Sequence, residues 1–184
     1  MKKIFMLEDN PDVFPSIEKL RRLGHTVTVT SNLKDAAYKL ECNPGVDYYD
    51  KFMFDAALIS ENVPHLKKKK EFVYYNEPNG FNGLLFLLNN LDTLGENAFR
   101  PERVAIITAL TNKLIHIPKI VMPNGKRSFE SSELPKADSK LMIFNKRVPK
   151  IRYTDNKRNI YTFSYIDKTT SDVLALIRTF IGRG

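Results

Sequence analysis

The sequence predicts an α/β fold, a doubly wound sheet of five parallel strands with helices on both faces. Short apolar runs alternate along the chain with stretches of helical periodicity. The predicted strands are largely apolar, as strands covered on both faces must be. No shift in composition separates two regions, so we expect residues 1–184 to form one domain.

The composition is that of an ordinary globular protein, with 42% hydrophobic and 27% charged residues. No apolar run reaches the roughly 20 residues of a membrane-spanning helix. The apolar run after the basic start Met1-Lys2-Lys3 is too short for a signal peptide. The single cysteine, Cys42, cannot form an internal disulfide, which favours a reducing compartment. We therefore expect a cytoplasmic protein that does not contact the membrane.

The first two strand–helix units have clear boundaries. A strand is predicted at 3–7 (KIFML) and a second at 26–30 (TVTVT), where every residue is β-branched. Asn10 and Pro11 are typical of the start of the first helix, and Gly24 is typical of its end. A second helix is expected from Asn32, with apolar residues on one face.

Three further strands are predicted from apolar runs, at 54–59 (FDAALI), 103–108 (RVAIIT) and 141–145 (LMIFN). A leucine-rich helix is expected between the third and fourth strands. The last helix should begin at a capping box that runs from Thr169 to Asp172. This order gives the alternation of strands and helices that a parallel sheet needs.

Three segments interrupt this alternation and are expected to form inserted loops or hairpins after strands three, four and five. They cover residues 61–82, 110–140 and 150–168. The first is far longer than the usual connection of about 2–6 residues. In the second, Asn124-Gly125 predicts a hairpin turn. Residues 151–166 could form another hairpin.

The net charge of +8 permits binding to nucleic acid or to an acidic partner. The positive charge is densest at four consecutive lysines, which aromatic residues follow. These residues are Lys67, Lys68, Lys69, Lys70, Tyr74 and Tyr75. Such a mixture can contact phosphates and stack on bases. A solvated loop is the more common role of a lysine run, so nucleic-acid binding stands as the alternative function.

Polar residues mark the carboxyl ends of four predicted strands. Glu8 and Asp9 follow the first strand, Ser60 ends the third, Thr108 ends the fourth and Lys146 follows the fifth. In doubly wound sheets, ligands bind outside the carboxyl ends of the strands. An acid pair, a hydroxyl and a lysine at this edge form an arrangement that handles phosphate or metal.

Four segments in order, IFMLEDNPDV, FDAALISENVP, RVAIITA and LMIFNK, resemble the strands and loops of a response-regulator receiver domain. The resemblance covers nearly the whole chain apart from the insertions, and it implies a flavodoxin-like receiver topology. It also implies that Glu8 and Asp9 help to bind Mg²⁺. Thr108 would contact a phosphoryl group, and Lys146 would pair with the same anion.

The same resemblance puts Ser60 where the family has its phosphoacceptor aspartate. Asp55 would lie at the start of the predicted strand, about 16 Å away, so we expect that it does not substitute. A serine is a weak nucleophile without an activating base, and losing one of three acids weakens Mg²⁺ binding. The sequence thus predicts a pseudo-receiver with a vestigial pocket and no resident cofactor. It would be a non-enzymatic regulator that acts through a protein partner.

Each of these residues also has a plain structural role open to it. Acids are favoured at a helix N-terminus, which accounts for Glu8 and Asp9 without a metal. Thr108 suits any strand, and Lys146 can be a surface lysine. A third candidate function is a metal-dependent phosphotransfer or hydrolytic site that includes Glu61. The oligomeric state is also left open.

Overall fold

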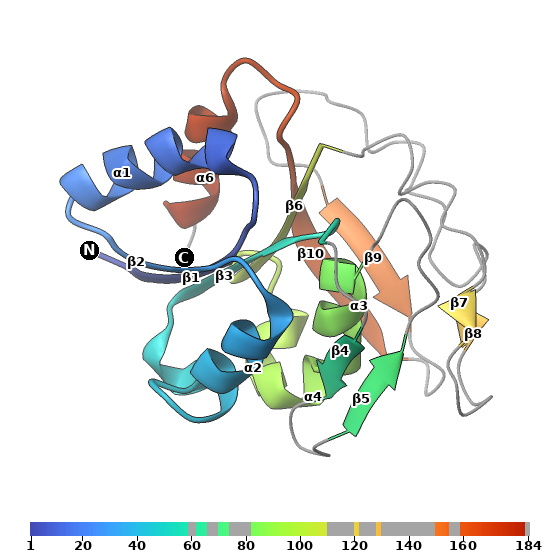
Figure 1. Ribbon diagram of the computed structural model, residues 1–184. Helices are drawn as coiled ribbons and strands as arrows, with labels where there is room; N and C mark the ends of the chain where they lie inside the picture. Colours follow the sequence, from blue (N-terminus) through green and yellow to red (C-terminus); the bar gives the residue numbers. More distant parts are fainter. Residues whose placement is uncertain are drawn as a thin grey trace.

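A computed structural model describes most of the chain (Figure 1). The described residues are 1–58, 62–65, 70–73, 82–109, 120–121, 128–129, 150–154 and 159–182. The strands of the main sheet are β1 (Lys3–Leu7), β2 (Thr26–Thr30), β3 (Lys51–Asp55), β6 (Val104–Thr108), β9 (Lys150–Thr154) and β10 (Ile160–Asp167).

These strands lie side by side in the order β2-β1-β3-β6-β10-β9. The first five pair in parallel, and β9 pairs with β10 in the antiparallel direction. The parallel strands therefore follow the order 2-1-3-4-5, which is that of flavodoxin-like folds. The predicted fold class, a doubly wound sheet of five parallel strands, is confirmed.

Helices cover both faces of the sheet (Figure 1). On one face lie α1 (Phe14–Arg22), which follows the short 3₁₀ helix η1 (Pro11–Val13), and α6 (Val173–Ile181). On the other lie α2 (Leu33–Glu41), α3 (Asn82–Asn89), α4 (Leu91–Leu94) and η4 (Gly95–Phe99). Another 3₁₀ helix, η2 (Val46–Tyr48), precedes β3. No helix of the described residues is long and apolar enough to span a membrane.

The two cores reflect the alternation of side chains along each strand. In β1, Ile4 and Met6 pack with the α1 and α6 side chains, whereas Phe5 and Leu7 pack with those of α2 and α3. All four are fully buried. Successive side chains of a strand point to opposite faces, so a strand between two helical layers must be apolar throughout.

The predicted helix boundaries are largely confirmed. The side chains of Asn10 and Asn32 accept hydrogen bonds from the backbone N–H groups of Asp12 and Asp35, at 2.9 and 2.8 Å. Gly24 follows α1 with a φ of 87°, which favours glycine. The capping box before α6 was predicted one turn too early, because Asp172 itself is the N-cap and accepts from the Ala175 N–H.

The inserted segments contain two small antiparallel hairpins. β4 (Asn62–His65) pairs with β5 (Lys70–Val73), and β4 contacts α2 and α3. β7 (Ile120–Val121) pairs with β8 (Ser128–Phe129), which confirms the hairpin predicted around Asn124-Gly125. That turn itself lies outside the described residues.

Two strand predictions were wrong. The third strand is β3, residues 51–55, and not 54–59. The fifth parallel strand is β10, which continues directly toward α6, whereas residues 141–145 lie outside the described part of the chain. The predicted hairpin at 151–166 exists as β9 and β10. Because β10 also pairs with β6, this segment belongs to the main sheet and is not an insertion.

Candidate functional site

The first carboxylate of the site is Glu8, at the carboxyl end of β1. Its backbone N–H donates to the Thr30 carbonyl oxygen at 2.9 Å, and its Oε1 accepts from the Asn10 N–H at 3.0 Å. The pairing of β1 with β2 therefore fixes the backbone of Glu8, and the turn into η1 fixes its carboxylate. The Glu8 side chain is fully buried, an unusual position for a carboxylate unless it has a partner.

The second carboxylate is Asp55, which is the last residue of β3. The strand begins three residues before the predicted start, so Asp55 lies at the same sheet edge as Glu8 and not at the opposite edge. This corrects the expectation that Asp55 is too distant to take part. Its Oδ1 accepts a hydrogen bond from the Ala57 N–H at 3.1 Å. The Ala56 N–H donates to the Ile107 carbonyl oxygen at 3.1 Å, which ties this turn to β6.

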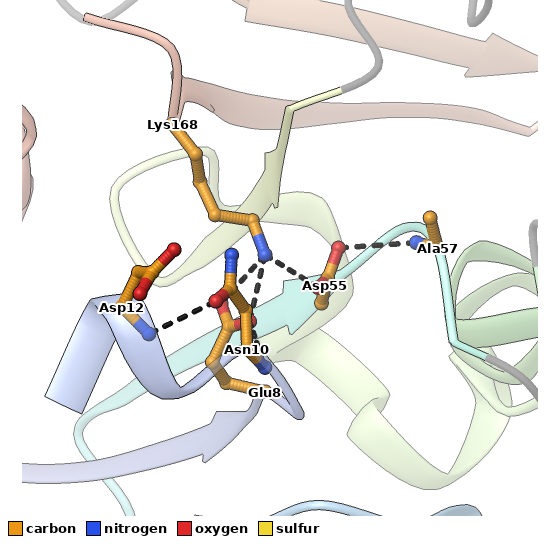
Figure 2. Close-up of polar contacts among 6 residues, drawn as sticks. All are labelled: Glu8, Asn10, Asp12, Asp55, Ala57 and Lys168. Atoms are coloured by element: carbon orange, nitrogen blue, oxygen red, sulfur yellow. Dashed lines mark hydrogen bonds and ion pairs between the residues drawn. The ribbon is translucent and has the colours of Figure 1, made fainter.

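The cation of the site is Lys168, the residue after β10. Its ammonium lies 2.7 and 2.9 Å from the two Glu8 carboxylate oxygens and 2.5 Å from Asp55 Oδ2 (Figure 2). The exposed fractions of the three side chains are 6% for Lys168, 0% for Glu8 and 4% for Asp55. The Lys168 N–H also donates to the Thr108 carbonyl oxygen at 2.9 Å, which holds the end of β10 beside β6.

A third carboxylate, Asp9, lies beside the pair and is exposed. One oxygen from each of Glu8, Asp9 and Asp55 lies within 4.8 Å of the others. Carboxylate oxygens are the ligands that Mg²⁺ prefers, and they come here from two strand ends. The residues present therefore fit a hard divalent cation.

The pKa values follow from burial and from this excess of negative charge. Burial, together with the Asp55 charge, raises the pKa of Glu8 to about 7 against the opposing effect of Lys168. Burial also raises the pKa of Asp9, and the Asp55 charge acts in the same direction. Burial alone would lower the pKa of Lys168, but the Asp55 and Glu8 carboxylates outweigh it and raise that pKa. Three carboxylates thus face one lysine ammonium, and a proton or a metal ion would reduce the imbalance.

The structure brings together some of the residues that the sequence singled out. Glu8 and Asp9 lie in the site, and Thr108 ends β6 opposite Asp167, fully buried. Ser60, Glu61 and Lys146 lie outside the described residues. The same holds for Lys67, Lys68, Lys69, Tyr74 and Tyr75, and Lys70 begins β5, its side chain not described.

Sequence reasoning missed the role of Asp55 and of Lys168, although each carried a signal. The fully apolar run Phe52-Met53-Phe54 ends at Asp55, as a central parallel strand ends at the functional edge of a sheet. The segment FSYIDK ends in a lysine just before the last helix, where the alternation requires the fifth strand.

The site is thus built from an acid pair after β1, an acid at the end of β3, a threonine at the end of β6 and a lysine after β10. All four positions lie at one edge of the sheet, where flavodoxin-like folds bind their ligands. No protein-family model matches the chain, and neither a curated protein nor a solved structure matches it.

Proposed function

We propose that this chain is a receiver-like signalling protein that accepts a phosphoryl group on Asp55 and acts through a protein partner. The observation that carries the proposal is the position of Asp55 at a strand end, beside Glu8 and Asp9 and in contact with Lys168. In the receiver family that the sequence resembles, this is the arrangement of the phosphoacceptor, the acid pair and the lysine.

The chemistry assigns a role to each of these side chains. A carboxylate oxygen of Asp55 attacks the phosphorus of a phosphodonor, a new O–P bond forms, and the donor's leaving group departs with the electrons of the broken bond. Lys168, already paired with Asp55, supplies positive charge beside the transferred phosphoryl group. Thr108 ends the neighbouring strand β6, and the family resemblance implies that its hydroxyl would contact that group.

A divalent cation belongs to this proposal. Glu8, Asp9 and Asp55 would hold Mg²⁺, which would supply positive charge against the phosphoryl oxygens. Glu8 must lose its proton to serve as a ligand, and its raised pKa makes that step sensitive to pH near neutrality. Asn10 and Ala57 orient the Glu8 and Asp55 carboxylates through their backbone N–H groups.

The proposal differs in one respect from the pseudo-receiver expected from the sequence. That expectation of an unphosphorylated protein depended on Ser60 ending the third strand, and β3 ends at Asp55. Regulation through a protein partner is kept as the mode of action. A cytoplasmic location, in a reducing compartment, also remains part of the proposal, and the single cysteine, Cys42, supports it.

The test is incubation of the purified protein with Mg²⁺ and a small acyl phosphate. We expect the mass of the intact chain to increase by one phosphoryl group, which hydroxylamine should remove because the product is an acyl phosphate. Asp55→Asn should abolish the gain, whereas Ser60→Ala should leave it unchanged.

Asp47→Asn is the matched control, because it removes an exposed carboxylate from η2, away from the cluster. It should be phosphorylated like the unaltered protein. Phosphate that persists in Asp55→Asn, or that Ser60→Ala removes, would contradict the proposal. So would a protein that gains no phosphate from any donor in the presence of Mg²⁺.

A further inference from the structure

The first turn of α3 lies directly against the end of β3. The contact is made by Gly83, the second residue of the helix. A Cβ atom at this position would overlap the Asp55 carbonyl oxygen. It would also lie 3.0 Å from the Asp55 carbonyl carbon and 3.1 Å from Leu58 Cδ1. The backbone of the helix therefore approaches the backbone of Asp55 too closely for any side chain to fit between them.

The conformation of Gly83 does not explain why glycine stands there. The described glycines with a positive φ are Gly24, Gly45 and Gly95, and Gly83 is not among them. In the first turn of a helix, alanine is normally favoured over glycine. Glycine at position 83 is thus explained by the close approach to Asp55 and not by the local backbone.

The same turn of α3 also holds the residue after Asp55. The Leu84 N–H donates to the Ala56 carbonyl oxygen at 3.2 Å. The next residue, Ala57, donates its N–H to Asp55 Oδ1, so the backbone of this turn orients the carboxylate. A shift of residues 55–57 would therefore move the Asp55 carboxylate relative to Glu8 and Lys168.

We propose that Gly83 is a positioning residue for Asp55, because its missing side chain lets α3 set where the carboxylate lies in the cluster. The inference rests on the proposed function only for its readout in phosphorylation and metal binding. The close approach of the α3 backbone to the Asp55 carbonyl group is a feature of the fold and does not depend on that function. Gly83 does not touch the reacting atoms and takes no part in the chemistry.

The first experiment compares Gly83→Ala with Gly182→Ala. Gly182 caps α6, and the nearest heavy atom to a Cβ there is the Arg178 carbonyl oxygen at 3.4 Å, an ordinary contact. We expect Gly83→Ala to weaken Mg²⁺ binding, measured by calorimetry, by about tenfold to 100-fold. Its rate of hydroxylamine-sensitive phosphorylation should fall in parallel, and Gly182→Ala should match the unaltered protein. Unchanged metal affinity and rate in a folded Gly83→Ala would overturn the proposal.

A second experiment does not depend on phosphorylation. If Gly83 sets the position of Asp55 against Lys168, then Lys168→Met should lower the unfolding midpoint less in the Gly83→Ala background than in the unaltered protein. Strictly additive effects would mean that Gly83 is merely structural, and they would overturn the proposal. This double-mutant cycle separates the positioning role of Gly83 from the proposed phosphorylation of Asp55, because the coupling can be observed even where the protein accepts no phosphate.

A third measurement covers the case in which Gly83→Ala does not fold. In the unaltered ¹⁵N-labelled protein, Mg²⁺ should shift the amide signals of Gly83 and Leu84 together with that of Ala57. The amides of Gly24 and Gly45 serve as controls and should keep their positions. A shift of Ala57 without one of Gly83 would overturn the proposal.

Discussion

The Lys168 ammonium lies 2.5 Å from Asp55 Oδ2, although the two residues are 113 positions apart in the sequence. The contact joins the end of β3 to the end of β10 across the intervening strand β6. Both side chains are almost completely buried, so water screens their charges little. The pair thus couples the stability of the sheet to the charge state of the site.

Replacing Lys168 by methionine should destabilise the protein at pH 7.5. The change leaves the buried carboxylates of Glu8 and Asp55 without their cation, and breaking a buried pair typically costs about 3–5 kcal/mol. The loss should be smallest below about pH 7 and should grow above it, because Lys168 lowers the pKa of Glu8 and the variant therefore keeps the proton on Glu8 to a higher pH than the unaltered protein. Urea denaturation at pH 8.5 and pH 6 measures both effects. The exposed Lys19→Met is the control, and an equal loss at both pH values would contradict this assignment.

Replacing Glu8 by glutamine should weaken Mg²⁺ binding by at least about tenfold, because one of three carboxylate ligands becomes a neutral amide. Glutamine keeps an oxygen that can accept from the Asn10 N–H, so the turn after β1 should persist. Isothermal calorimetry at pH 7.5 gives the two affinities. Asp12→Asn, which removes an acid outside the cluster, should bind Mg²⁺ like the unaltered protein, and a comparable loss there would point to a non-specific charge effect.

A pH effect away from the site is expected from Lys51. This side chain is 1% exposed, its ammonium donates to the Glu102 carbonyl oxygen at 2.5 Å, and burial lowers its pKa to about 8. Between pH 8 and 10.5 the unfolded chain still holds the proton that the folded chain has lost. The free energy of unfolding should therefore rise with pH across this window, by up to about 3 kcal/mol.

Lys51→Met should remove that rise, and denaturant unfolding of both proteins at pH 7.5 and pH 10 measures it. Other groups titrate in the same window, so the quantity compared is the difference between the two proteins. A difference that stays constant with pH would show that Lys51 titrates alike in the folded and unfolded chains.

The core next to the site should contribute strongly to the stability of the protein. Phe54 is buried between Phe5 and Phe86, at ring-centroid distances of 5.6 and 6.3 Å. Phe54→Ala should lower the free energy of unfolding by about 3–5 kcal/mol, because it removes a buried ring and leaves a cavity. Phe14→Ala removes an exposed ring and should change stability by less than about 0.5 kcal/mol. Thermal or urea unfolding of the two variants measures these changes, and similar losses of stability would contradict the burial of Phe54.

The first half of the fold was predictable because its signals are local. Asn10 and Asn32 cap their helices through bonds to residues two and three positions away, and β2 has the composition of a strand. The third strand was misplaced because a lysine, Lys51, normally marks a loop. Here two backbone carbonyl oxygens from distant segments, those of Glu102 and Phe180, accept its hydrogen bonds inside the protein.

The start of β3, three residues before the predicted start, also leads to a different proposed function. With a strand at 54–59, Asp55 falls at the wrong edge and Ser60 takes its place. With β3 at 51–55, Asp55 contacts Lys168, and only the fold brings together these two residues, which are 113 positions apart. Choosing the fifth strand had the same difficulty, since LMIFNK and FSYIDK are alike in composition and only the pairing of β10 with β6 distinguishes them.

The wide spacing of the site along the chain also has a consequence for how the protein is made. Lys168 leaves the ribosome 113 residues after Asp55, which at about 5–20 residues per second is roughly 6 to 23 seconds later. During that interval, Glu8 and Asp55 have no Lys168 to pair with. A growing chain that folded its first three strands would hold these acids together only with a bound proton or metal ion. Among the strands of the described sheet, β10 comes last along the chain, and it completes the charge balance of β1 and β3.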